Sequence, residues 1–290
     1  MSGRLGAFVA LVRAPAALTV PGDTLAGAAA AGLGLRGRRL ALPVASACLY
    51  WAGMALNDYA DRALDADERP ERPIPSGRVT PGEALAMAGG LTGAGLALAA
   101  VGGGRAAVRV AVPLAVAVWA YDLLLKSTPL GPAAMATCRG LDVLLGASGG
   151  REGVRAALPA AAAIAVHTAG VTALARGEVH GASPTAARAA ASGTALVGLA
   201  TAVGPAASPR HRLLGALGAA AYGLLVGRAQ TAASRDPSAA AVRGATIAGI
   251  HGMVPLQAAL TARAGAPASA VGLLAAFPAA RALSRRVSPT

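Results

Sequence analysis

Three oxygen-bearing side chains recur at every fourth position in the stretch NDYADRALDADERPERPIPSGR, residues 57–78. They are Asn57, Asp61 and Asp65. Because four residues advance an α-helix by little more than one turn, all three are expected on one helix face. Such oxygens suit a hard cation such as Mg²⁺, which is usually held by a few carboxylates and substrate phosphates. The spacing predicts a Mg²⁺ site. The alternative is a solvated acidic helix end, although carboxylates at a helix C-terminus oppose the helix dipole.

The loop that follows the acidic stretch is rich in arginine and proline. In ERPERPIPSGR, Arg69 and Arg72 come directly after the carboxylates and alternate with prolines. Guanidinium groups bind phosphate oxygens through paired hydrogen bonds, and the prolines reduce the entropy that the loop loses on ordering. The arginines could simply neutralise the acidic cluster, but a metal-bridged diphosphate requires both signs of charge together. We therefore expect both arginines to contact a diphosphate.

This combination resembles the aspartate-rich motif of the UbiA superfamily of intramembrane prenyltransferases. That motif reads N-D-x-x-D-x-x-x-D followed by R-P-x-R-P-x-x-S-G, and the match covers residues 57–77. The resemblance implies an all-helical membrane protein that uses Mg²⁺ to transfer an isoprenyl group from its diphosphate to an acceptor. It implies these roles: Mg²⁺ binding by Asn57, Asp61 and Asp65, catalytic support from Asp58, and diphosphate binding by Arg69 and Arg72.

A second match is YDLLLK, at the end of the fourth apolar segment. The family often shows Tyr-Ser-x-x-Leu-Lys there, so the resemblance implies a catalytic place for Tyr121 and a diphosphate contact for Lys126. Asp122 replaces the serine and is a cavity candidate. Lys126 is the only lysine of the chain, which favours a required ammonium group. A lysine that extends from a helix end into the membrane interface is the alternative.

Other polar residues interrupt apolar segments and are candidates for the wall of a cavity. CRGLDVLLG places Arg139 and Asp142 three residues apart, resembling the family's Arg-x-Leu-Asn stretch with Asp142 in place of asparagine. Charges inside a membrane usually face a cavity or a partner, so a structural ion pair between these two is an equal alternative. Arg13 resembles the family's arginine of the first helix. His251 lies in mid-segment, where an interhelical hydrogen bond is the commoner role.

The chain departs from the family pattern at the end of the sixth apolar segment. The family repeats D-x-x-D-x-x-x-D there, whereas this chain reads VHTAGVTALARGEVHG. Glu178 is the one carboxylate of that stretch and cannot hold a second Mg²⁺ as three would. Either one metal suffices, or the donor is bound differently, or Glu178 and His167 serve the acceptor. Glu178 and His167 could act as a general base on an acceptor hydroxyl, with Thr172 and Arg176 beside them. A polar helix end is the alternative. The pattern is similar to a divergent bacterial branch, the EboC-like proteins.

The composition is that of a multi-span membrane protein. The chain is 55% hydrophobic and 13% charged, and its mean hydropathy is +0.55. A membrane-spanning helix needs about 20 apolar residues. Breaks rich in Gly, Pro or charge separate ten apolar segments, near 7–35, 40–61, 83–102, 106–125, 131–149, 155–176, 185–207, 211–231, 240–262 and 266–284. We predict one all-α domain over residues 1–290, a bundle of nine or ten transmembrane helices around a central cavity.

The distribution of charge restricts the partners. The formal net charge is +13, but aromatic residues are 3% and the arginines are scattered between apolar segments, which argues against nucleic acid. Membrane lipids and an anionic substrate are the expected partners. Basic residues are modestly enriched on the side of the 57–78 loop, which predicts a multi-pass cell-membrane protein with its site loops in the cytoplasm. Cys48 and Cys138 are expected to be buried thiols.

The function predicted from these features is Mg²⁺-dependent transfer of an isoprenyl group to a small-molecule or lipid acceptor within the membrane. An intramembrane terpene cyclase of the same superfamily is an alternative, although the scarcity of aromatic residues disfavours it, because cyclases use them to stabilise carbocations. A cation-linked transporter is a more distant alternative. Transporters repeat their charged sites in both halves of the chain, and the second half here lacks the acidic motif.

Overall fold

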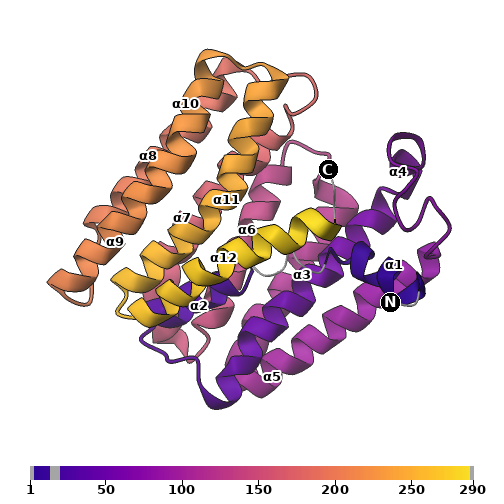
Figure 1. The fold of residues 1–290 in the computed structure, drawn as a ribbon. Coiled ribbons are helices and arrows are strands. Elements are labelled where there is room, and N and C mark those ends of the chain that lie inside the picture. Colours follow the sequence, from indigo (N-terminus) through magenta and orange to yellow (C-terminus); the bar gives the residue numbers. More distant parts are fainter. Residues whose placement is uncertain (1–2, 14–19, 288–290) are drawn as a thin grey trace.

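The computed structural model describes residues 3–13 and 20–287, with side chains as far as residue 278. Within these ranges the chain contains helices and no strand (Figure 1), which confirms the predicted all-α class. The elements in chain order are α1 (Gly3–Leu11), α2 (Pro21–Ala30), η2 (Gly37–Leu40), α3 (Ala41–Ala60), α4 (Arg62–Glu68), α5 (Pro81–Ala120), η3 (Tyr121–Leu125), α6 (Gly131–Gly146), α7 (Arg151–Ala175), α8 (Pro184–Val203), α9 (Pro209–Tyr222), η4 (Gly223–Gly227), α10 (Arg228–Arg235), α11 (Ala239–Arg263) and α12 (Pro267–Val287).

Nine of the ten predicted apolar segments coincide with helices. Segments 83–102 and 106–125 are the two halves of α5, and segment 211–231 covers the continuous run of α9, η4 and α10. The first, 7–35, instead holds the two short helices α1 and α2, and residues 14–19 of it lie outside the described ranges. In the described part of the chain, four stretches are long and apolar enough to cross a membrane. They are Gly37–Ala60, Pro81–Leu125, Arg151–Ala175 and Pro184–Val203.

Serine or threonine followed by proline marks where several helices begin. The side chain of Thr80 accepts a hydrogen bond from the backbone N–H of Glu83, and Pro81 occupies the first helical position. Ser183 and Ser208 cap α8 and α9 in the same way, each followed by a proline. These hydroxyls bond backbone N–H groups that the first helical turn leaves free, and proline at that position loses no hydrogen bond.

The long helix α5 reverses direction at Gly104, whose φ of 60° and ψ of −150° are not helical. Before the turn α5 runs antiparallel to α3, and after it the chain returns parallel to α3. A hydrogen bond of 3.1 Å from the indole of Trp119 to the hydroxyl of Thr92 joins the two halves. Residues 83–102 and 106–125 are therefore two separate crossings, as predicted, and the second delivers residues 121–126 beside the end of α3.

Helices α2 and α6 lie between two groups of helices (Figure 1), one formed by α3 and α5 and the other by α7 to α11. Two glycines allow α2 and α6 to approach closely. A Cβ atom at Gly27 would collide with the carbonyl group of Val143, and one at Gly146 would collide with the backbone of Thr24. Small residues at a crossing let helix backbones pack directly in lipid, where the hydrophobic effect gives little drive for association. This contact fixes the position of α6 beside α3.

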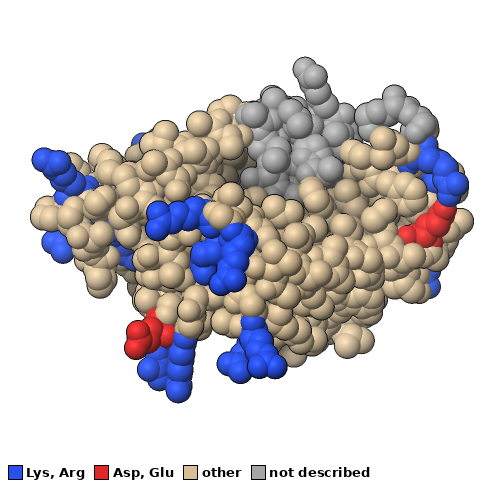
Figure 2. Space-filling model, turned by 90° about the horizontal axis from the view of Figure 1, so that it is seen from below, with Lys and Arg blue, Asp and Glu red and all other residues tan. Residues whose placement is uncertain are grey.

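The outer surface of the bundle is apolar. Leucine and valine side chains remain largely exposed along the spanning helices, for example Val116 at 63% and Leu124 at 71%. On the face shown in Figure 2, basic side chains project singly or in small groups from a surface that is mostly uncharged. A contiguous apolar exterior on long helices is what a lipid environment requires.

Candidate active site

The acidic residues lie where α3 ends and the short helix α4 begins. Asp61 sits at the junction with φ −87° and ψ 3°, and backbone hydrogen bonds from Asp61 to Asn57 and from Asp65 to Asp61 keep a near-helical path. The small distortion at Asp61 separates the predicted stripe into two parts. Asp65 turns inward beside Asp58, and both carboxylates are buried. Asn57 and Asp61 face the end of the neighbouring chain segment η3.

Two arginines neutralise the buried pair of carboxylates. The guanidinium of Arg72 lies 2.6 Å from Asp65 and 3.5 Å from Asp58, and that of Arg13 lies 3.1 Å from Asp58. Arg69 is about half exposed and lies 3.8 Å from Asp65. Buried carboxylates are costly without such partners, so the arginines stabilise the acidic cluster in this arrangement. The expectation that arginines and acids lie together at one place is met.

The proline-rich loop holds Arg72 in place. Ile74 and Val79 are buried against apolar residues of α1, α3 and α5 and anchor the loop to the bundle. Within the loop the backbone N–H of Val79 donates to the carbonyl of Pro73, and the hydroxyl of Ser76 donates to the carbonyl of Arg72 at 2.6 Å. The loop is therefore a compact turn whose arginine position is set by packing.

The second motif reaches the site through the π-helical turn η3. The backbone N–H of Lys126 donates to the carbonyl of Tyr121, five residues earlier. Asp122 accepts a hydrogen bond of 3.1 Å from the amide of Asn57, and the ammonium of Lys126 lies 2.6 Å from a carboxylate oxygen of Asp61. Residues 65 positions apart in the chain thus meet at one place, as the two matches to the family motif require.

The predicted metal ligands do not converge on one point in this arrangement. Among the residues described, no three acidic, histidine or cysteine side chains are grouped as a metal site. Asp61 faces Lys126, and Asp65 faces Arg72. The donor set still fits Mg²⁺, because this ion prefers oxygen ligands and commonly takes only one or two carboxylates together with substrate phosphates. The cations that now hold these carboxylates are those expected to bind the diphosphate.

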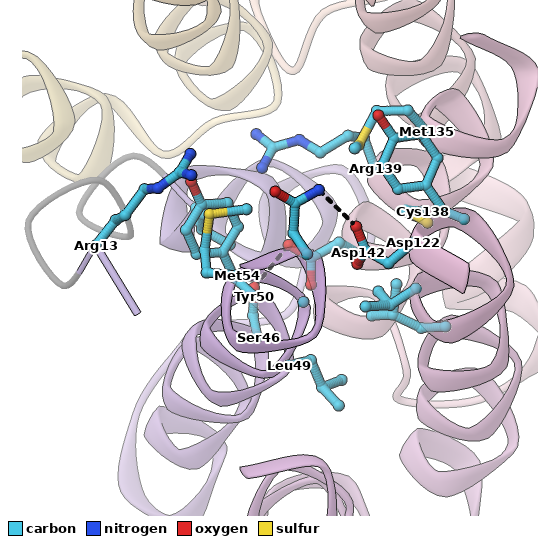
Figure 3. A pocket seen from close by; sticks show the side chains of 16 residues that line it. Arg13, Ser46, Leu49, Tyr50, Met54, Asp122, Met135, Cys138, Arg139 and Asp142 are labelled. Carbon is cyan, nitrogen blue, oxygen red and sulfur yellow. Dashed lines mark hydrogen bonds between the residues drawn. The ribbon is translucent and has the colours of Figure 1, made fainter. Parts of the chain in front are cut away.

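A cavity of about 240 Å³ extends from Asn57 and Asp122 into the interior of the bundle, between α3, α5 and α6 (Figure 3). Leu49, Leu114 and Val118 form part of its apolar wall. Several predicted residues line it, and they come from separate elements: Arg13, Asn57, Tyr121, Asp122, Arg139 and Asp142. The sequence analysis did not single out Ser46 and Tyr50 of α3, which also line it.

The ion pair considered between Arg139 and Asp142 is wrong. The Nε atom of Arg139 lies 2.9 Å from a carboxylate oxygen of Asp23 in α2, and Gln257 of α11 donates a 2.6 Å hydrogen bond to the other oxygen. Asp142 instead accepts a 2.6 Å hydrogen bond from the hydroxyl of Ser46. Asp23 was missed, although a carboxylate within an apolar segment is itself a signal of a buried partner.

The polar residues near the end of the sixth segment lie elsewhere. The two ring nitrogens of His167 are hydrogen-bonded to the Tyr222 hydroxyl at 2.9 Å and the Gly249 carbonyl at 3.0 Å, in a fully buried position. Because a carbonyl only accepts, Nε2 carries the proton and Nδ1 accepts from Tyr222. His167 thus packs three helices together, and neither it nor Glu178 is among the residues that line the cavity. The base role proposed for them has no support in these positions.

The other candidates of the second half do not line the cavity either. Arg176 is exposed and donates to the carbonyl of Thr128 at 2.6 Å. His251 packs edge-on against Phe277 of α12, with ring centroids 5.7 Å apart. Thr172 is half-buried on α7. None of the three is among the residues that line the cavity between α3, α5 and α6.

Known proteins resemble this chain in sequence and in fold. Residues 20–243 match the model of the UbiA prenyltransferase family. Proteins named digeranylgeranylglyceryl phosphate synthase are similar in sequence. That of Methanopyrus kandleri is 39% identical over 107 residues, which cover 37% of this chain and 39% of the relative. That of Natronomonas pharaonis is 36% identical over 145 residues, which cover 49% of this chain and 52% of the relative. The matches to these curated relatives thus span about half of their length or less.

Two solved structures share the fold at low sequence identity. One, from work on digeranylgeranylglyceryl phosphate synthase in membranes, superposes with a TM-score of 0.68 at 17% identity and covers 90% of this chain and 98% of the other. The second, an apo UbiA homologue from Aeropyrum pernix K1, gives a TM-score of 0.69 at 19% identity and covers 84% and 96%. Because the family model matches residues 20–243, which is well over half of the chain, this chain belongs to the UbiA prenyltransferase family.

Proposed function

We propose that this protein transfers an isoprenyl group from an isoprenyl diphosphate to an acceptor inside the membrane, with Mg²⁺. One observation carries the proposal. The acids of α3 and α4, the arginines of the 69–72 loop and the lysine after η3 form ion pairs at the end of α3. They do not line the cavity themselves but lie next to Arg13, Asn57 and Asp122, which do. A diphosphate needs cations and a metal, and its hydrocarbon chain needs an apolar environment. This place offers cationic side chains and oxygen ligands for a metal beside an apolar cavity.

The residues of this charged cluster would divide the work as follows. Asn57, Asp61 and Asp65 would hold Mg²⁺, which stabilises the negative charge that develops on the leaving diphosphate. Arg69, Arg72 and Lys126 would bind the phosphate oxygens and stabilise the same charge. As they do so, Arg72 and Lys126 would leave Asp65 and Asp61 free to bind metal. Asp58, bonded to Arg13 and Arg72, would keep Arg72 in place.

We extend the proposal to the identity of the isoprenyl donor, to the residues that act as one unit and to the side of the membrane on which the site lies. The similar curated proteins are named for a product that carries geranylgeranyl groups, so geranylgeranyl diphosphate is the first donor to test. Residues 1–290 are proposed to act as one unit, because α12 packs on α11 beyond the family match. The modest excess of basic residues on the side of the 57–78 loop supports a cytoplasmic site in the cell membrane.

The test is product formation by the purified full chain. We would incubate it with C10 to C20 isoprenyl diphosphates, Mg²⁺ and a membrane extract and identify products by mass spectrometry. Asp61→Ala should abolish turnover without loss of folded protein, whereas Asp67→Ala, which removes an exposed acid of the adjoining helix α4, should retain it. Full activity of Asp61→Ala would contradict the scheme. A terpene formed with no acceptor present would indicate a cyclase, and ion flux without any prenyl chemistry would indicate a transporter.

A further inference from the structure

We propose that a cleft at the end of the bundle opposite the candidate active site binds the phosphate group of an anionic membrane phospholipid, with Arg263 as its ligand. The cleft has a volume of about 360 Å³ and lies between α2, α7, α11 and the connection from α8 to α9. Helix α3, which is 20 residues long, separates this end from the acidic cluster by about 30 Å. The proposal therefore concerns a second site and does not depend on the proposed function.

The surface at this end of the bundle is strongly basic. The connections after α2 and α6 meet the turn of α5 here, since a Cβ atom at Gly149 would collide with Leu33 and one at Gly103 would lie 3.2 Å from the carbonyl oxygen of Ser148. Figure 2 shows the molecule from below, where basic side chains are far more frequent than acidic ones. Anionic lipid is the expected neighbour of such a surface. Ten arginines and one acid, Glu152, belong to it: Arg36, Arg38, Arg39, Arg105, Arg109, Arg151, Arg155, Arg210, Arg212 and Arg263.

Two backbone carbonyls at the end of α8 hold one nitrogen of Arg263. Its Nη1 atom donates to the carbonyl of Ala200 at 2.9 Å and to that of Thr201 at 3.0 Å. Gly204 leaves the space that this arrangement requires, since a Cβ atom there would collide with Nη1. The carbonyl of Arg263 in turn accepts a hydrogen bond of 3.1 Å from the backbone N–H of Ala207. The guanidinium group is therefore held in place at the wall of the cleft.

The other edge of the same guanidinium group is free for a ligand. The Nε and Nη2 atoms of Arg263 make no hydrogen bond among the described contacts, and neither atom is fully buried. Their N–H groups point in parallel, which is the geometry that binds two oxygens of one phosphate group. Arg263 is the only charged residue in the lining of the cleft, and it forms no ion pair with a described carboxylate. Charged groups of membrane helices usually face a partner or a cavity, and an anion in the cleft would be that partner.

The walls of the cleft suit a lipid rather than a soluble anion. Gly32, Ala264 and the 205–207 connection line the part at the end of the bundle. Leu260 and Ala160 lie about one helical turn deeper and are apolar. Inorganic phosphate would leave these apolar walls in contact with water, whereas a phospholipid places its phosphate at the guanidinium group and its hydrocarbon against them. The volume of about 360 Å³ is within the range of roughly 300–1,000 Å³ that is usual for small-molecule sites.

Native mass spectrometry of the full chain in detergent, after removal of copurified lipid, would measure lipid binding. The ligands are dioleoylphosphatidylglycerol, dioleoylglycerol, which lacks the phosphate, and inorganic phosphate, which lacks the hydrocarbon. We expect one molecule of phosphatidylglycerol to bind about 10- to 100-fold more tightly than dioleoylglycerol, the range that a hydrogen bond to a charged group gives. Inorganic phosphate should not displace it at an equal concentration.

Two changes in the cleft and two matched controls test the site. Arg263→Gln should lower the affinity for phosphatidylglycerol to that for dioleoylglycerol. Ala156→Trp fills the cleft from α7 and leaves the bonds of Arg263 to α8 in place, so it should abolish binding and serves if the glutamine variant does not fold. The controls should keep the affinity of the unchanged protein. They are Ala162→Trp, at an exposed position of α7 outside the cleft, and Arg105→Gln, which removes an exposed arginine of the same basic end.

Equal affinity for dioleoylglycerol, or unchanged phosphatidylglycerol binding in either cleft variant, would overturn the proposal. An equal loss in Arg105→Gln would indicate a diffuse attraction of lipid to the whole basic end, and displacement by inorganic phosphate would indicate a site for a soluble anion. Either of these results would overturn it as well. The assay contains no isoprenyl diphosphate, so its outcome is separate from that of the test for prenyl transfer.

Discussion

Replacing Lys126 by glutamine should change the binding of Mg²⁺ and of diphosphate in opposite directions. The ammonium lies 2.6 Å from a carboxylate oxygen of Asp61, and the two side chains are 16% and 28% exposed. Mg²⁺ added alone must displace the lysine from Asp61, whereas diphosphate uses the lysine as a ligand. Glutamine removes the competitor of the metal and also removes a cation that binds the phosphate.

The size of both effects follows from this ion pair. Hydrogen bonds to charged groups contribute about 1.5–3 kcal/mol, and exposed ion pairs at most about 1 kcal/mol, so a partly exposed pair is worth about 1–2 kcal/mol. Binding of Mg²⁺ alone should therefore tighten about 5- to 30-fold, and binding of inorganic diphosphate with Mg²⁺ should weaken by a similar factor.

Isothermal titration calorimetry in detergent would measure both affinities. Arg62→Gln is the matched control, because Arg62 is a cation of α4 that stacks on Tyr59 and has no ion pair among the described contacts. A fall of both affinities in Lys126→Gln, or no change in that of Mg²⁺, would refute the reasoning that lysine and metal compete for Asp61.

Two further predictions concern the helix contacts that position the site. Asp23→Leu leaves Arg139, whose side chain is only 14% exposed, without its carboxylate partner and should lower the free energy of unfolding by about 3–5 kcal/mol, measured by SDS titration. A second change, Arg139→Met, should restore most of this loss, and a double variant no more stable than the single one would contradict the idea. Gly27→Ala should lower the free energy of unfolding by about 1–3 kcal/mol in the same titration, because the added methyl group clashes with Val143. The control is Gly90→Ala, in open space on α5, which should leave the stability unchanged or slightly higher. Equal effects of the two changes would contradict the close crossing of α2 and α6.

The positions of the membrane helices could be predicted well because hydropathy and helix-breaking residues act locally. The Gly-rich break near residue 103 correctly divided α5, and prolines after serine or threonine marked helix starts. The first segment was less predictable. Its residues are mostly apolar, yet it holds two short helices, α1 and α2. Pro21 begins a new helix, and Arg13 adopts a left-handed conformation at φ 46°.

The partners of charged residues could not be predicted in the same way. Arg139 and Asp142 share a helix face, so local geometry suggested their pairing, but the partner of Arg139 proved to be Asp23, more than a hundred residues earlier. A long arginine side chain reaches whichever carboxylate the tertiary packing places nearby, and sequence spacing carries no information on that. His167 is a similar case, since its two hydrogen-bond partners lie on α9 and α11.

The reversal of α5 at Gly104 also bears on how the chain enters the bilayer. The turn contains no loop, and Arg105 and Arg109, just after Gly104, are the charged groups that mark the boundary between the two crossings. The hydrogen bond between Trp119 and Thr92 satisfies polar groups of both halves only when they lie side by side. The two crossings therefore suit insertion as a preformed hairpin rather than one after the other. In that case the helix that presents Asp122 and Lys126 acquires its orientation during biogenesis, before the rest of the bundle assembles.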